Sequence, residues 1–142
     1  MLRNIPPILS PELLKTLRAM GHNDVIILVD ANYPADSGAK RLIRADGASV
    51  TDMLDAVLQF FPLDSFVEHP VALMRPLAEE PTPEIWSEFR DILHKWDVEK
   101  AFSDFRLIDR MDFYTYANNA YAIVQTGTTA RYANIALQKG VI

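Results

Sequence analysis

Val25-Ile26-Ile27-Leu28-Val29, followed by Asp30, is the stretch of sequence that decides the fold. A strand with one wet face alternates apolar and polar residues, whereas an unbroken run of β-favouring apolar residues is typical of a strand buried on both faces. Further layers of structure must then cover both faces of its sheet. The run therefore predicts a strand inside a largely parallel sheet, with Asp30 at its carboxyl end.

The residues before this strand predict a helix over 11–20. Ser10 is suited to cap its N-terminus, and Pro11 suits the first helical position. The apolar side chains that follow fall on one helical face: Leu13, Leu14, Leu17 and Met20. Gly21 is expected to stop the helix. His22 is therefore expected in the loop between helix and strand, outside the buried stripe.

Helical and strand-like patterns alternate along the rest of the chain. Strands are expected at 41–44, 71–74, 106–108, 121–124 and 133–137, and helices at 49–61, 82–96 and 113–120. Such alternation predicts an α/β fold of three layers, with a largely parallel sheet and helices on both faces. No internal repeat, low-complexity stretch or linker divides the sequence, so residues 1–142 are expected to form a single domain.

The composition argues against several classes of partner. The 142 residues carry a net charge of −5, whereas binding a nucleic acid or an anionic membrane needs a basic surface. The chain has no cysteine, so neither disulfides nor thiolate metal sites are expected. It opens without a signal-peptide pattern, and no apolar run approaches the roughly 20 residues that span a membrane. We expect a cytoplasmic protein whose ligand is a small molecule.

Polar residues follow several of the expected strands. Ligands of open α/β sheets bind beyond the carboxyl ends of the strands. Asp30 ends the first strand, Arg110 follows the strand at 106–108, and Thr126 and Gly127 follow the strand at 121–124. These positions are candidates for one polar site, in which Asp30 would hold the hydroxyl groups of a ligand.

Three further residues could add proton transfer and hydrogen bonding. His22 carries an imidazole, which ordinarily titrates near neutral pH and can give and take protons. Tyr132 and Asn134 are two residues apart, so on a strand they would face the same side. That arrangement would aim a phenol and a carboxamide at one polar ligand.

Each candidate also has a purely structural explanation. Asp30 could be a turn former or a helix cap, and His22 an ordinary residue at a helix C-terminus. Arg110 could pair with a neighbouring aspartate at the surface. Tyr132 and Asn134 could form an edge-strand pair with ordinary hydrogen bonds. The residues alone leave both sets of explanations open.

Several cofactor and catalytic motifs are absent. No G-x-G-x-x-G follows a strand, and no phosphate-binding P-loop or G-x-S-x-G nucleophile elbow is present. The three histidines lack zinc-type spacing. We therefore expect neither a metal nor a cofactor. The residues by themselves indicate an α/β domain with a small polar ligand.

Ordered blocks of sequence run through nearly the whole chain. They are Ile8–Leu14, Met20–Asp24, Val29–Ala35, Ile43–Gly47, Pro62–Val67, Phe113-Tyr114, Ala122–Val124, Thr126-Gly127, Tyr132–Asn134 and Lys139–Val141. In this order and spacing the sequence resembles the RbsD/FucU family, which holds D-ribose pyranases and L-fucose mutarotases. The blocks at 43–47 and 62–67 resemble the fucose branch.

The resemblance implies a fold, an assembly and an activity. The expected fold is a three-layer arrangement resembling a Rossmann-type sheet. The expected assembly is a homo-oligomer, built of pentameric rings or a decamer, with sites near subunit contacts. The expected activity is that of an isomerase, a mutarotase that exchanges the α and β anomers of L-fucose. Pyranase activity on D-ribose uses the same ring opening.

The resemblance also implies a role for each matching residue. His22 corresponds to the proton donor. The residues that correspond to the monosaccharide-binding set are Asp30, Arg110, Tyr132, Ala133 and Asn134, with Ala133 contributing its backbone. The chain departs from the fucose branch at Asn32 and Asp36, where many bacterial members carry histidine, and at Ala133, which is often glycine. Two alternatives are a non-catalytic monosaccharide-binding protein associated with sugar transport and a structural ring-forming protein with a decayed site.

Overall fold

A computed structural model describes residues 1–142 and contains one six-stranded sheet. The strands are β1 (Val25–Val29), β2 (Leu42–Ala45), β3 (Val71–Met74), β4 (Arg106–Ile108), β5 (Ala122–Thr126) and β6 (Ile135–Gln138). The helices are α1 (Pro11–Ala19), α2 (Ala35–Gly38), α3 (Val50–Leu58), α4 (Ile85–Trp96) and α5 (Arg110–Asn119). None of these helices has the length and apolar character needed to cross a membrane.

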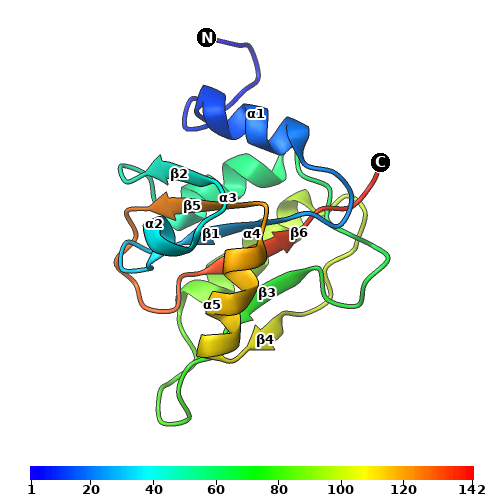
Figure 1. The fold of residues 1–142 in the computed structure, drawn as a ribbon. Coiled ribbons are helices and arrows are strands. Elements are labelled where there is room, and N and C mark those ends of the chain that lie inside the picture. The colour runs from blue at the N-terminus through cyan, green and yellow to red at the C-terminus, as the bar shows by residue number, and fades with distance from the viewer.

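The sheet is largely parallel and has one reversed strand. Its order is β2-β5-β1-β6-β3-β4 (Figure 1). The pairs β1–β5, β2–β5 and β3–β4 are parallel, whereas β6 runs antiparallel to both β1 and β3. The start of β6 therefore lies at the edge where β1 and β3 end. This reversal brings the residues before β6 to the carboxyl ends of the parallel strands.

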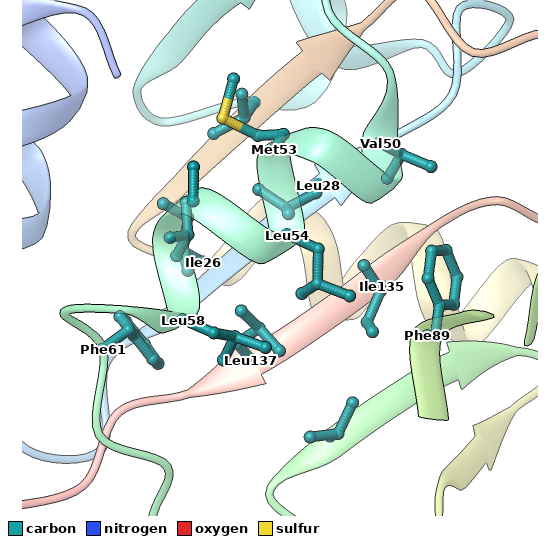
Figure 2. Close-up of a cluster of buried hydrophobic side chains, with 14 of the residues drawn as sticks. Ile26, Leu28, Val50, Met53, Leu54, Leu58, Phe61, Phe89, Ile135 and Leu137 are labelled. Carbon is teal, nitrogen blue, oxygen red and sulfur yellow. The ribbon is translucent and has the colours of Figure 1, made fainter. Parts of the chain in front are cut away.

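Helices cover both faces of the sheet, as the sequence predicts. The larger core cluster packs α1, α3 and α4 on one face, where Ile26 and Leu28 of β1 meet Leu54 of α3 (Figure 2). The smaller cluster packs α5 and the start of α2 on the other face, against Ile27 and Val29. Each fully buried side chain of this kind contributes about 1.5–3 kcal/mol. The α/β prediction, with β1 buried on both faces, is confirmed.

The end of α1 differs from the prediction in detail. Ser10 caps the helix by accepting from the Leu13 N–H at 3.1 Å, as expected. The helix stops at Ala19, however, and no glycine in the chain has a positive φ. Asn23 takes the left-handed conformation instead, with φ 71°. Lys139 ties the helix end to the sheet by donating to carbonyl oxygens of its last turn.

Several other elements differ from the sequence prediction, among them α3, which ends at Leu58, and α4, which begins at Ile85. The helix α2 was not predicted from the sequence, because its four residues are too few to give a periodic pattern. The helix α5 begins at Arg110, three residues earlier than expected. The last strand was expected from Ala133 but begins at Ile135, and Tyr132 before it has φ 57°. The prediction that Tyr132 and Asn134 share one face of a strand is therefore wrong.

Candidate functional site

A small polar cleft lies where β1, β3 and β4 end and β6 begins. Its volume is about 210 Å³. It is lined by Asp30, Asn32, Tyr33, Met74, Arg110, Tyr114, Arg131, Tyr132 and Asn134. The cleft thus brings together four of the predicted site residues, from segments far apart in the sequence. Ala133 does not line it, because its side chain is fully buried in the larger core cluster.

Asp30 is held firmly at the end of β1. Its N–H donates to Asn134 Oδ1 at 2.9 Å, its carbonyl accepts from Gln125 Nε2 at 2.5 Å, and its Oδ1 accepts from the Asn32 N–H at 2.9 Å. Burial raises the pKa of Asp30 above its ordinary value, although the hydrogen bond from Asn32 and the neighbouring Asn134 lower it in part. Asp30 is the only acid lining the cleft.

Arg110 reaches the cleft from the first residue of α5. It forms no ion pair, and Asp109 instead binds Arg75, with Nε and Oδ1 at 2.8 Å. The structure therefore does not support surface pairing between Arg110 and a neighbouring aspartate. Two strands, β6 and β3, separate β1 from β4, so Arg110 and Asp30 reach the cleft from opposite sides. Between them lies space for a small polar molecule.

Thr126 and Gly127 were expected to join this site but do not line it. Thr126 Oγ1 donates to the Val29 carbonyl at 2.8 Å, and the Gly127 N–H donates to the Ala48 carbonyl at 2.9 Å. The Thr126 hydroxyl and the Gly127 N–H therefore already donate hydrogen bonds within the protein. Thr126 therefore supports the end of β1, and Gly127 ties the chain after β5 to the segment between β2 and α3.

Tyr132 is clamped by a residue that the sequence did not single out. Its hydroxyl donates to Glu80, which lies in the loop between β3 and α4. Arg131 Nη2 lies 2.5 Å from Glu80 Oε1, and the Leu77 N–H lies 3.3 Å from Glu80 Oε2. The bond to Tyr132 lowers the pKa of Glu80 and raises that of Tyr132. These contacts, here called the clamp, hold Tyr132 in a left-handed backbone conformation, which costs on the order of 1–3 kcal/mol.

His22 lies at the opposite end of β1. Six residue steps of about 3.3 Å separate Asp24 from Asp30, so His22 is roughly 20 Å from the cleft within one chain. Its ring Nε2 is 3.2 Å from Asp64 Oδ2, and its side chain is 46% exposed. Within one chain, therefore, the structure does not bring His22 together with Asp30, Arg110 and Asn134.

Asp64 is the buried partner of His22. It accepts from the Phe66 N–H at 3.0 Å and from Gln138 Nε2 at 3.0 Å. Burial would raise the pKa of Asp64, but these bonds and the one to His22 outweigh it and lower the pKa. Gly140 permits this arrangement, since a Cβ there would overlap the Leu63 carbonyl and the Asp64 backbone. A carboxylate is therefore held against the imidazole.

The surroundings of His22 are largely apolar. A hollow of about 690 Å³ beside it is lined by residues of α1, by Phe60 and Pro62, and by the last residues of the chain. Phe66 packs edge-on against the His22 ring with 5.7 Å between ring centroids, and is itself 74% exposed. Val141 and Ile142 are exposed as well. An exposed apolar rim around a histidine is typical of a surface that meets another molecule.

Comparison with known proteins agrees with this fold. The model of the RbsD / FucU transport protein family matches residues 3–142. The chain belongs to this family. It is 42% identical to human fucose mutarotase over 99% of this chain and 94% of that protein. The crystal structure of the Streptococcus pneumoniae fucose mutarotase in complex with L-fucose has a TM-score of 0.90 and 44% identity, covering 99% of each chain. Bifidobacterium longum FucU has a TM-score of 0.91 and 38% identity, over 97% of this chain and 98% of that one.

Proposed function

We propose that this protein of the RbsD/FucU family is a mutarotase that interconverts the α and β anomers of L-fucose. The observation that carries this function is the cleft itself, in which Asp30, Arg110 and Asn134 converge from three segments of the chain. The match to human fucose mutarotase over nearly the full length supports L-fucose as the substrate. The likeness to a fucose mutarotase solved with L-fucose supports the same assignment.

The cleft residues supply the groups that a monosaccharide needs. A sugar presents hydroxyls that both donate and accept, so its site requires charged acceptors, charged donors and amides. Asp30 accepts from sugar hydroxyls, Arg110 donates to them, and Asn134 orients the ring. Tyr132, held by Glu80, forms a wall of the cleft. Ala133 contributes only its backbone, because its side chain belongs to the core.

His22 reaches the sugar from a neighbouring copy of the chain in a homo-oligomer, for which pentameric rings or a decamer are expected. The separation of His22 from the cleft within one chain leaves this as the arrangement in which both can act on one sugar. The exposed apolar rim of Phe66, Val141 and Ile142 supports a subunit contact at this end of the sheet. The bond to Asp64 orients the imidazole before it meets the sugar.

Opening the sugar ring then needs two proton transfers, and closing it reverses them, so the protein's protonation state is the same before and after the reaction. The protonated His22 imidazole gives a proton to the ring oxygen as the bond between that oxygen and C1 breaks. The C1 hydroxyl loses its proton to an acceptor, and an open-chain aldehyde forms. Asp30 is suited to accept this proton, because burial makes it a stronger base than an exposed carboxylate. Rotation about the C1–C2 bond and the reverse transfers close the ring with the other anomer.

Saturation-transfer NMR on equilibrated L-fucose tests the function. We expect the protein to accelerate exchange between the anomeric proton signals, and we expect His22→Ala to abolish this while the fold is preserved. Positioned proton transfer typically contributes about 10²–10⁴-fold. His69→Ala is the matched control, since His69 is a surface histidine that contacts the Asp104 carbonyl at 3.1 Å. Unaccelerated exchange with the unmodified protein would refute the assignment.

The same experiment separates two related possibilities. A non-catalytic sugar-binding protein would bind L-fucose without accelerating exchange, and its His22→Ala variant would behave like the parent. D-ribose as a second substrate measures pyranase activity, which requires the same ring opening. A cytoplasmic location, expected from the sequence, is part of this proposal.

A further inference from the structure

The hydroxyl of Tyr33 is the one buried side-chain polar atom that has no hydrogen-bond partner. Tyr33 is 93% buried, since only 7% of its surface is exposed, and it lines the polar cleft. Buried polar groups in proteins are almost always hydrogen-bonded, and an orphaned one calls for an explanation. A ligand that is absent from the free protein is such an explanation, particularly for a residue in a binding cleft.

The ring of Tyr33 is held in place by its neighbours. It packs edge-on against Phe113 and tilted against Tyr114, with centroid distances of 6.2 and 5.4 Å. Its N–H donates to the Asp30 carbonyl at 3.2 Å, which forms a tight turn immediately after β1. The backbone and the ring are therefore both restrained. The hydroxyl cannot readily swing out to water in the free protein.

Polar groups of the cleft surround this hydroxyl without bonding to it. The Tyr114 ring packs against Tyr33, and Asp30 lines the same cleft. Burial raises the pKa of Tyr33, and the charges of these two neighbours raise it further. Neither side chain forms a hydrogen bond with the Tyr33 hydroxyl. Asp30 already accepts from the Asn32 N–H but has unused lone pairs. A hydroxyl placed between the carboxylate and the phenol would donate to the first and accept from the second.

We propose that the Tyr33 hydroxyl donates a hydrogen bond to a hydroxyl oxygen of the bound monosaccharide, one that also donates to Asp30. Tyr33 is thereby a specificity-determining residue, which selects for a hydroxyl at one position of the sugar. This role rests on the proposed mutarotase function. The Tyr33 hydroxyl gives up no bond of the free protein, so binding gains the net value of one hydrogen bond after the sugar hydroxyl has lost its bond to water.

Tyr33→Phe removes only the hydroxyl and tests this role. We expect KM for L-fucose to rise about fivefold, the value of one neutral hydrogen bond, with kcat changed less than twofold. We expect the melting temperature to stay equal or rise, because the free protein loses no hydrogen bond. Tyr116→Phe is the matched control, since Tyr116 packs at the edge of the same core cluster but does not line the cleft.

Deoxy analogues of L-fucose identify the sugar position. For the analogue that lacks the partner hydroxyl, the unmodified protein and Tyr33→Phe should have the same KM, whereas the other analogues should keep the fivefold difference. An unchanged KM for L-fucose, or a melting temperature several degrees lower, would overturn the role of Tyr33 and leave the mutarotase function standing. Absence of exchange in the unmodified protein would instead refute the mutarotase function.

Discussion

Replacing Asp64 by asparagine tests whether a buried carboxylate positions His22. The substitution keeps the shape of the side chain, and Oδ1 can still accept from the Phe66 N–H. The atom at Oδ2 becomes an NH₂ group that faces two donors, Gln138 Nε2 at 3.0 Å and His22 Nε2 at 3.2 Å. Two hydrogen bonds to a charged acceptor are thereby lost.

The expected loss of stability is about 1.5–3 kcal/mol at neutral pH. The hydrogen bond from Gln138 to the charged carboxylate is worth about that much. The bond from His22 adds little, because His22 is half exposed and can form a hydrogen bond with water instead. For a domain of this size each kcal/mol shifts the melting temperature by about 2–4 °C. We therefore expect Asp64→Asn to melt about 3–12 °C lower. Exchange of L-fucose anomers should fall about 10–100-fold, since a misplaced catalytic group costs about that much.

The pH dependence of this difference has a definite sign. The pKa of Asp64 is lowered in the folded protein, so its charge stabilises the fold above the ordinary value of 3.8 and the effect is lost as pH falls through the lower folded value. The gap between the two melting temperatures should therefore narrow below about pH 4. Asp46→Asn, which removes an exposed partner of Arg44, should change little. A variant of Asp64 with unchanged melting temperature and unchanged exchange would refute the positioning role.

Two further substitutions separate binding from folding. Asp30→Asn removes a buried carboxylate whose pKa is raised by burial, so in thermal melting the fold should become about 0.5–2 kcal/mol more stable at pH 7. Binding of L-fucose, measured by calorimetry, should be lost. A less stable variant that still binds L-fucose would contradict this. The gain should shrink as pH falls and Asp30 itself becomes neutral. Glu80→Gln weakens the clamp on Tyr132, so KM for L-fucose should rise several-fold with little change in kcat, and an unchanged KM would show that the clamp is not needed.

Local patterns in the sequence predicted most of the elements correctly. The strand predicted at Val25–Val29 has the same bounds in the structure, because burial on both faces leaves an unbroken apolar pattern in the sequence. Ser10 and Pro11 marked the start of α1 because capping depends on adjacent residues alone. Asp30 and Arg110 were found because they follow strands, and the structure places both in one cleft.

Features that depend on long-range contacts could not be predicted. The reversed direction of β6 leaves no mark in its sequence, although it brings Asn134 beside Asp30. The clamp from Glu80 to Tyr132 spans 52 residues, and the bond between His22 and Asp64 spans 42. The orphaned hydroxyl of a buried tyrosine is likewise visible only once its neighbours are in place. By contrast, the sequence itself placed His22 before and Asp30 after the strand Val25–Val29, so their separation within one chain follows from the predicted strand.

Subunit complementation most directly tests whether His22 of one copy serves the cleft of another. His22→Ala keeps an intact cleft, and Arg110→Ala keeps an intact His22, so each variant alone should be nearly inactive in anomer exchange. When the two are co-expressed and assemble at random, about a quarter of the sites should combine an intact cleft with an intact His22. We predict recovery of about that fraction of the exchange rate of the unmodified protein. Mixed assemblies with no more activity than the separate variants would contradict a site shared between subunits.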